Sequence, residues 1–294
     1  MKYIIPAAVF LLMVSVGMSL RPKQMLANLR RMKWTQWAGL LLATFFVPAA
    51  LALLVGRVLP LITAEMAGLF LVGAAPGAPL MTRNIAKRGF DMQLAAAYQV
   101  WGGLLTPFIL PVVVWTAGLL YRVRIWIPPN DVLLEIIEKQ FVPLLVGMLL
   151  AHFLPAFSTS AQVWMNRLGN AVLTLGILAM LWIMRETLKG LLTWWLPLGA
   201  LLLAVGSIAT IRILVPGLDP LSRRTLSICN ANRHVGLALL LSGQYLRLKG
   251  ALPAVAAYAL VAPFVMGGLS WWFHRNEKLA PEIAGGSPNA LNAK

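Results

Sequence analysis

The sequence predicts an all-α polytopic membrane protein, and three observations lead to this fold class. Hydrophobic residues make up 60% of the 294 residues and charged residues only 12%, too little polar surface for a water-soluble domain. Apolar runs of about 20 residues, the length that crosses a bilayer as a helix, recur along the chain. The cations behind the net charge of +16 lie mostly between these runs, as topology determinants do, so we expect no nucleic acid partner.

About nine transmembrane helices are expected from these runs. The first run follows Lys2 and is short, as in a secretory signal, but no small-residue cleavage site with polar residues after it is present. We therefore expect a retained helix rather than a removed signal. The expected spans are residues 3–20, 36–59, 64–86, 92–121, 131–154, 168–184, 191–215, 221–246 and 251–273.

The cations between the spans predict the orientation of the chain. When consecutive loops are assigned to alternate sides, one side collects more Lys and Arg, and the excess is heaviest in the first loop. The positive-inside rule then places the N-terminus outside, and residues 275–294 form a short, disordered cytoplasmic tail. We expect a monomer in the lipid bilayer of the bacterial inner (plasma) membrane. The five cations of the first loop are Arg21, Lys23, Arg30, Arg31 and Lys33.

Two of the expected spans contain a break. Pro76, Gly77 and Pro79 lie near the middle of the third span, where proline removes a backbone donor and glycine adds freedom. The middle of the eighth span, NANRHVG (residues 230–236), has no apolar face at helical spacing, and its Asn side chains compete for backbone hydrogen bonds. Irregular backbone at membrane depth occurs only where protein buries it or water reaches it, so both breaks predict a cavity.

Arg233 lies near the middle of the bilayer in this interpretation. It follows Arg223 by ten positions, which corresponds to about 15 Å of helix, or half of the hydrocarbon thickness. A charge at that depth costs at least about 2.5–3.5 kcal/mol, so it is expected to face the interior and have a partner. The nine Asp and Glu residues all fall at or near expected span ends or in loops, so the sequence offers no obvious counter-ion.

The two broken spans occupy corresponding positions in two blocks of helices. The eighth span is the fourth helix of a block at residues 127–274, and the third is the fourth helix of a block at residues 1–126 that lacks its first helix. The blocks run in opposite directions, which is the pattern of an inverted repeat with a substrate site at the midplane. We expect one membrane transporter domain, residues 1–294, with two broken crossing helices.

Two stretches of the chain resemble the bile acid:sodium symporter family. They are GAAPGAPLMTRNIAKRGFDMQLAAAYQVWGGLLTP at residues 73–107 and RRTLSICNANRHVGLALLL at residues 223–241. The first is similar to the family's Pro-Gly crossover, and the second to the segment that leads into its second crossover. The resemblance implies a divergent bacterial-type member with a panel domain, a core domain, and a substrate site where the broken helices cross.

The chain departs from the family at the positions that bind sodium in sodium-coupled members. Their glutamate and glutamine of the second crossover appear as Cys229 and Arg233, and a Ser-Asn pair after the Pro-Gly appears as Met81 and Thr82. Sodium requires several hard oxygen ligands, and most of these are absent. We therefore expect no cofactor and no ordinary sodium coupling, with Arg233 taking the place of the bound cation.

The predicted substrate site contains polar residues of both breaks. Arg233 binds the substrate or takes part in coupling, or else it binds backbone carbonyls that the break frees. His234 either carries a proton, for which its ordinary titration range is suited, or simply donates a hydrogen bond. The expected substrate-binding residues are Arg233, Asn230, Asn232, His234, Pro76, Gly77 and Thr82.

These residues favour a secondary transporter of a small organic anion that works by alternating access. Two alternatives remain, namely a sodium-dependent symporter of bile-acid type and a transport-inactive membrane receptor. An intramembrane enzyme is not expected, because the chain has no His-Glu-x-x-His motif, no Gly-x-Ser-Gly motif and no phosphate-binding glycine loop.

Overall fold

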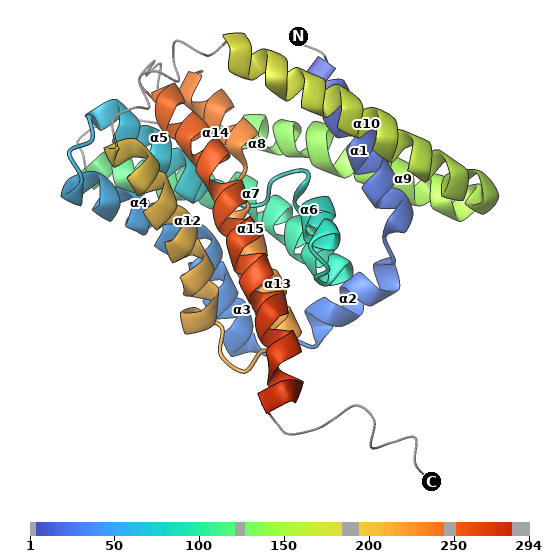
Figure 1. The fold of residues 1–294 in the computed structure, drawn as a ribbon. Coiled ribbons are helices and arrows are strands. Elements are labelled where there is room, and N and C mark those ends of the chain that lie inside the picture. Colours follow the sequence, from blue (N-terminus) through green and yellow to red (C-terminus); the bar gives the residue numbers. More distant parts are fainter. Residues whose placement is uncertain (1–3, 121–126, 184–193, 244–250, 284–294) are drawn as a thin grey trace.

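The computed structural model describes residues 4–120, 127–183, 194–243 and 251–283, and every regular element among them is a helix (Figure 1). The helices are α1 Ile4–Ser19, α2 Pro22–Arg30, α3 Trp34–Leu41, α4 Val47–Val58, α5 Thr63–Ala74, α6 Met81–Lys87, α7 Met92–Leu120, α8 Pro129–Ile136, α9 Val142–Phe153, α10 Pro155–Ile183, α12 Trp195–Leu214, α13 Pro220–Ala231, α14 Val235–Leu241 and α15 Ala251–Ile283. Two π-helical turns, η1 Leu42–Phe46 and η2 Ile137–Phe141, join α3 to α4 and α8 to α9.

The starts of several helices follow from local sequence. Proline lies in the first turn of α2, α8 and α13, where its missing N–H breaks no helical hydrogen bond. The Asp219 side chain caps α13 by accepting a hydrogen bond from the Ser222 backbone N–H at 2.9 Å. Hydrogen bonds from both the side chain and the backbone of Ser222 lower the pKa of the Asp219 carboxyl. Asp219 lies in the loop before α13.

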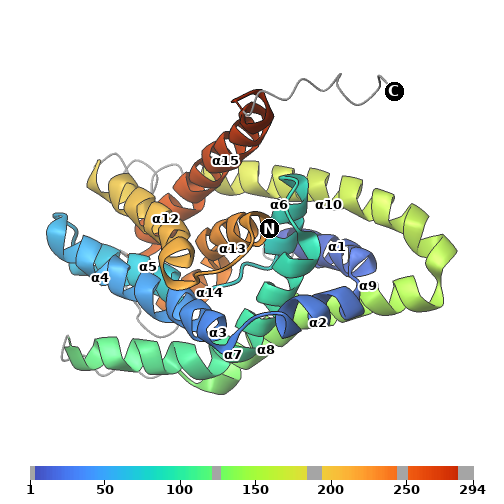
Figure 2. The same cartoon turned by 90° about the horizontal axis from the view of Figure 1, so that it is seen from below.

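Helices α1, α9 and α10 pack against one another and form a panel at one side of the molecule (Figures 1 and 2). Glycine allows the close approach of α1 to α9: a Cβ on Gly147 would collide with the backbone carbonyl of Val14, and one on Gly17 with that of Leu144. The Gln162 side chain of α10 donates to the backbone carbonyl of Ser15 at 3.3 Å.

A second group of helices forms the core on the other side of the molecule (Figure 2). Helices α4, α5, α12, α13 and α15 contact one another and share one large cluster of buried hydrophobic side chains. A much smaller cluster lies where α1 of the panel meets α7, around Met13, Val16 and Ala96. This division agrees with the panel and core that the family resemblance implies.

The described chain confirms the polytopic all-α fold. Each of the nine expected spans coincides with a helix, a π-interrupted helix or a broken pair of helices. Within the described residues, four helices are long and apolar enough by themselves to cross a membrane: Trp34–Val58, Met92–Leu119, Trp195–Leu214 and Ala251–Arg275.

Two expected boundaries were wrong. Helix α10 begins at Pro155, 13 residues before the start at residue 168 that the apolar pattern predicted, because polar residues of this stretch bond to α1. Helix α15 continues to Ile283, so residues 275–283 are helical and not part of a disordered tail. Residues 284–294 of that tail, and the interspan cations of residues 121–126, 184–193 and 244–250, lie outside the described residues.

Candidate functional site

The two broken helices cross at the centre of the molecule. Helices α5 and α13 have 12 residues each and enter the crossing from opposite ends, and the 7-residue helices α6 and α14 leave it (Figure 1). The irregular segments between them are held together by two backbone hydrogen bonds: Ala78 N–H donates to Asn232 O at 3.2 Å, and His234 N–H donates to Ala75 O at 2.9 Å. Gly77 has a φ of 74°, a left-handed conformation that glycine adopts without strain.

Arg233 is 2% exposed and binds to the core through two neutral oxygen atoms. Its Nη1 donates to the Thr44 backbone carbonyl at 2.7 Å, and its Nη2 donates to Asn230 Oδ1 at 3.1 Å. Thr44 lies in the π-helical turn η1, a type of irregularity that is frequent at functional sites. No carboxylate of the described residues forms an ion pair with Arg233.

Asn230 is the centre of a buried polar network inside the core. Its Nδ2 lies 2.9 Å from Ala43 O, 2.7 Å from Ser207 O and 2.9 Å from Thr210 Oγ1, while its Oδ1 also accepts from the Tyr98 hydroxyl at 3.0 Å. The side chain is therefore occupied by contacts within the protein, and Asn230 does not line the cavity described below.

A second network fixes the first crossing segment. The Thr82 hydroxyl donates to Gln99 Oε1 at 2.8 Å, and Gln99 Nε2 donates to Pro79 O at 3.0 Å. Gln140, which lies in the turn η2 next to the panel, donates from Nε2 to Gly77 O at 3.1 Å. Thr82 thus holds the backbone of the crossing in place, and Gln140 links this backbone to the α8–α9 helix.

A cavity of about 590 Å³ lies between the panel and the core, beside the crossing. Its walls are residues 78–80 and 231–236 of the two crossing segments, one side of α15, the first turns of α1, and the α8–η2 junction. Most of the lining side chains are apolar, which suits a ligand with an apolar body.

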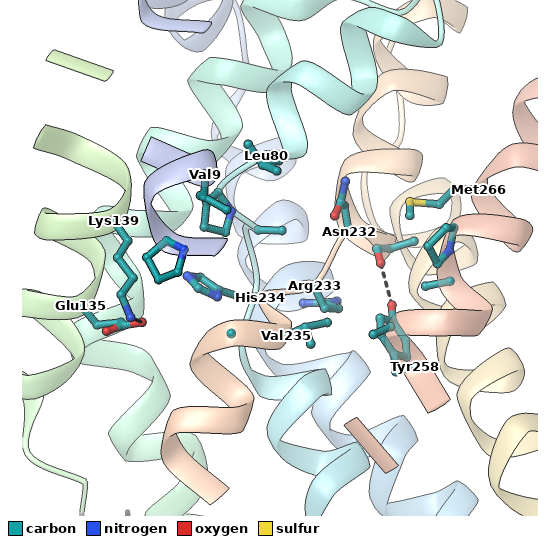
Figure 3. Close-up of a pocket in the computed structure, with 18 of the residues that line it drawn as sticks. Val9, Leu80, Glu135, Lys139, Asn232, Arg233, His234, Val235, Tyr258 and Met266 are labelled. Atoms are coloured by element: carbon teal, nitrogen blue, oxygen red, sulfur yellow. Dashed lines mark hydrogen bonds and ion pairs between the residues drawn. The ribbon is translucent and has the colours of Figure 1, made fainter. Parts of the chain in front are cut away.

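One wall of the cavity carries an ion pair. Lys139 Nζ contacts Glu135 Oε1 one helical turn away, and Glu135 is only 7% exposed. Figure 3 shows this pair on one side of the cavity and Tyr258 on the other, with His234 and Arg233 between them. The Tyr258 hydroxyl donates to Ala231 O at 2.6 Å. A second carboxylate, Glu138, also lines this wall of the cavity.

Three consecutive residues at the cavity wall carry hydrogen-bond donors without a partner. Asn232 Nδ2, Arg233 Nε and His234 Nε2 are buried and form no hydrogen bond within the described residues. His234 Nδ1 accepts from Leu237 N–H at 2.9 Å and so caps α14, which means that a neutral imidazole carries its hydrogen on Nε2. An unpartnered buried donor is costly, so an acceptor at this wall would be stabilising.

The predicted site residues therefore separate into two groups. Asn232, Arg233 and His234 line the cavity, whereas Pro76, Gly77, Thr82 and Asn230 build the crossing behind it. Sequence reasoning missed four polar or charged lining residues: Glu135, Glu138, Lys139 and Tyr258. The i,i+4 spacing of Glu135 and Lys139 inside an apolar span was a usable signal for the pair, but Tyr258 had none.

Comparison with known proteins gives a single family assignment. A search of curated proteins finds no match to this chain. The model of the Sodium Bile acid symporter family matches residues 6–190, more than half of the chain, including the first crossing segment and ending before the second. Together with the panel, the core and the two crossing helices, this match shows that the chain belongs to the sodium bile acid symporter family, a family of membrane transporters.

Proposed function

We propose that this protein is a secondary transporter that carries small organic anions through the cavity between panel and core. The three unpartnered donors of Asn232, Arg233 and His234 are the observation that supports it. Unpartnered donors beside the Arg233 charge favour a ligand that presents acceptor atoms and negative charge to this wall, whereas the opposite wall carries the carboxylates Glu135 and Glu138 together with Lys139. The apolar remainder of the lining favours a ligand whose charge is confined to one end.

Alternating access is supported by where the cavity lies. Residues of the panel helix α1 and of the α8–η2 junction form one wall, and core residues of the crossing and α15 form the other. The core is held by one extensive hydrophobic cluster, while the panel meets it through a small cluster and a few polar contacts, among them Gln140 to Gly77 O and Arg83 to Asn170. Movement of the panel against the core would open the same cavity to either side of the membrane.

We propose further that sodium does not drive this transport. Carbonyl and amide oxygens at a helix break are typical sodium ligands, and here Thr44 O and Asn230 Oδ1 already accept from the Arg233 guanidinium. Arginine is permanently charged and donates in a fixed plane, so it can hold the crossing together without a bound ion.

For the topology, we propose an outside N-terminus and a cytoplasmic C-terminus. Helix α2, which lies in the cationic first loop, and the end of α15 are at the same end of the molecule (Figure 1). This arrangement is expected if both lie at the cytoplasmic surface. A C-terminal reporter that is active only outside the cell would refute this orientation.

Thermal unfolding of the purified protein tests the ligand class. Benzenesulfonate and pyruvate are expected to raise the unfolding temperature, whereas the neutral, similarly shaped benzenesulfonamide and the cationic benzylammonium are not. Stabilisation by the neutral or cationic compounds alone would overturn the proposal.

The same measurement tests coupling. Replacing choline by sodium at constant ionic strength is expected to leave the unfolding temperature unchanged, and a clear rise would favour the sodium-dependent symporter. Uptake of radiolabelled pyruvate and benzenesulfonate into proteoliposomes separates a transporter from a receptor, because a transport-inactive receptor would bind an anion and show no uptake.

A further inference from the structure

The cavity between panel and core is lined by two cations and two carboxylates. Arg233 lies at the core wall, and Lys139, Glu135 and Glu138 lie at the opposite wall. Lys139 forms an ion pair with Glu135, whereas the Glu138 side chain forms no ion pair and accepts no hydrogen bond among the described residues. The charges of the ligand-free cavity therefore cancel over the cavity as a whole, although the core wall is positive and the opposite wall is negative.

Glu138 lies at the depth of the crossing and is open to the cavity. It belongs to η2, and Gln140 of the same turn donates to Gly77 O in the first crossing segment at 3.1 Å. The Glu138 side chain is exposed, whereas Glu135 is buried. An ionisable side chain within a membrane span is costly and typically marks the path of a substrate, an ion or a proton. Water in the cavity can reach Glu138, so a proton can bind there without a change of fold.

Binding of an anion changes the net charge of the cavity. The buried, unpartnered donors of Asn232, Arg233 and His234 would hold the anion at the core wall. The cavity would then have one net negative charge, which opposes its closure away from water between apolar walls. One proton on Glu138, the lining carboxylate without a cation partner, restores neutrality.

The other two candidates for this proton, His234 and Glu135, would each lose a bond by accepting it. His234 Nδ1 already accepts from Leu237 N–H at 2.9 Å, so a proton on this atom would break the cap of α14. The neutral ring instead keeps its hydrogen on Nε2, where it can donate to an anion. A proton on Glu135 would break its ion pair with Lys139.

The remaining titratable side chains around Glu138 are distant or already bonded. Helices α1 and α14 contain none, and α7 contains only Tyr98, whose hydroxyl is bonded inside the core. Helix α9 contains only His152, 14 residues after Glu138 and therefore about 20 Å away. Asp131 lies in the first turn of α8, two turns before Glu138. Across the cavity, the Tyr258 hydroxyl donates to a backbone carbonyl at 2.6 Å.

We infer that this protein carries each monovalent organic anion together with one proton, and that Glu138 binds the proton. The inference rests on the proposed transport of organic anions and names its coupling ion. The proton comes from water on one side, binds a carboxylate oxygen of Glu138, and returns to water on the other side when the anion leaves. The ligand-free cavity and the doubly loaded cavity are both neutral, so both can change orientation. A cavity that holds only the anion or only the proton is charged, and its change of orientation is slow.

Uptake into proteoliposomes tests the coupling. Radiolabelled benzenesulfonate is a suitable probe because sulfonates stay anionic, so no uncharged acid diffuses through the lipid. The lumen is made about 1.5 pH units more alkaline than the outside, which can drive accumulation of up to about thirtyfold at one proton per anion. Sodium is absent, and potassium with valinomycin clamps the membrane potential to zero. Vesicles with equal pH on both sides are expected to reach equal concentrations only.

A pH-sensitive dye in the lumen gives a second readout. At equal pH, addition of benzenesulfonate outside is expected to acidify the lumen, whereas the neutral benzenesulfonamide is not. Uptake that is independent of the pH gradient and leaves the lumen pH unchanged would overturn proton coupling and leave anion transport standing. Accumulation that requires a sodium gradient would overturn proton coupling in favour of sodium symport. No protein-dependent uptake under any of these conditions would overturn the proposed transport as well.

Glu138→Gln tests the site of the proton. Glutamine resembles the protonated carboxyl group, so the anion-bound cavity of this variant is neutral without a proton and its ligand-free cavity is positive. The variant is expected to lose accumulation driven by the pH gradient but to keep exchange of labelled for unlabelled benzenesulfonate, which does not need the ligand-free form to change orientation. The matched control is Glu65→Gln, outside the cavity, which is expected to keep both reactions because glutamine also completes the cap of α5.

Accumulation and exchange are measured in one preparation, so a smaller folded fraction does not distort their comparison. Wild-type accumulation in Glu138→Gln, or loss of exchange at an unchanged unfolding temperature, would overturn the assignment of the proton to Glu138. If Glu138→Gln gives no folded protein, His234→Gln decides. This variant is expected to keep accumulation driven by the pH gradient despite weaker anion binding, and loss of accumulation with exchange intact would assign the proton to His234 instead.

Discussion

Asn230 and Asn232 lie two residues apart at the second break, yet their surroundings predict opposite effects of the same substitution. Asn230→Ala removes four hydrogen bonds: the two that the Nδ2 hydrogens donate among three nearby oxygen atoms, and the two that Oδ1 accepts. Hydrogen bonds inside membrane proteins average about 0.6 kcal/mol each, which gives a loss of about 2.4 kcal/mol before any cavity is counted. Asn232→Ala removes a buried donor that has no partner, so no stability is expected to be lost.

Intrinsic tryptophan fluorescence during heating measures both effects in detergent. At roughly 2 °C per kcal/mol for a chain of this length, Asn230→Ala is expected to lower the unfolding temperature by about 5 °C. Asn232→Ala is expected to keep the unfolding temperature of the ligand-free protein and to lose most of the rise caused by an anion. Equal losses in the two variants, or an unchanged Asn230→Ala, would refute the division between a structural and a ligand-binding asparagine.

Three further substitutions have expected outcomes. Glu135→Gln removes the partner of Lys139 and should tighten anion binding, while Lys139→Gln removes the cation and should weaken it. Either change in the anion dissociation constant should reach up to about thirtyfold for a ligand charge about 8 Å away. Effects of the same sign for both variants in a thermal-shift titration would contradict this. Gly77→Ala places a Cβ in open space but at a φ of 74°, which costs about 1–2 kcal/mol of unfolding free energy. The control Gly102→Ala, at an equally open position inside a helix, should cost none. Equal unfolding temperatures of the two variants would rule out backbone strain at Gly77. Asp219→Ala removes the cap of α13 and costs about 1 kcal/mol of unfolding free energy at neutral pH. Because hydrogen bonds from the first turn lower the pKa of Asp219, this stabilisation is lost as pH falls through the folded-state pKa. The unfolding temperatures of the two proteins should therefore become equal in acid, and a difference that does not depend on pH would argue against the cap.

Both helix breaks could be predicted because their causes are local. Proline at position 76 has no N–H to donate, and glycine at position 77 adopts the left-handed conformation that turns the chain. In the second break, polar side chains replace the apolar face that a continuous span would need. Each signal lies within a few residues of the break, so no knowledge of the tertiary structure was required.

The partners of the polar residues could not be predicted, because they depend on distant backbone. Arg233 donates to Thr44 O, 189 positions away, in a π-helical turn whose residues, LATFF, form an ordinary apolar run. Gln140 reaches Gly77 O across 63 positions. Burial and helical periodicity can be predicted from sequence patterns. The position of a π-helical turn, and hence which of its carbonyls points toward a neighbouring helix, cannot.

The late start predicted for α10 has a different physical cause. Residues 155–167 contain Ser158, Gln162 and Arg167 and appear too polar for a span. In the structure, Gln162 bonds to Ser15 O and to Ser19 Oγ of α1. A polar stretch can thus be part of a helix in the panel when a neighbouring helix accepts hydrogen bonds from its donors. From hydropathy alone, the same residues are predicted to be a loop.

Some polar residues of the second break contact the core and others line the cavity, and Arg233 does both. Its Nη atoms satisfy oxygens of the core, and its Nε has no partner at the cavity wall. Hydrogen bonds to neutral oxygens satisfy donors but leave the net charge uncancelled, and in an apolar surrounding its field extends into the cavity. Only an opposite charge removes that field. The apolar walls add contact area without a fixed polar pattern, so this site is expected to select ligands by charge at one end rather than by the detailed shape of the rest.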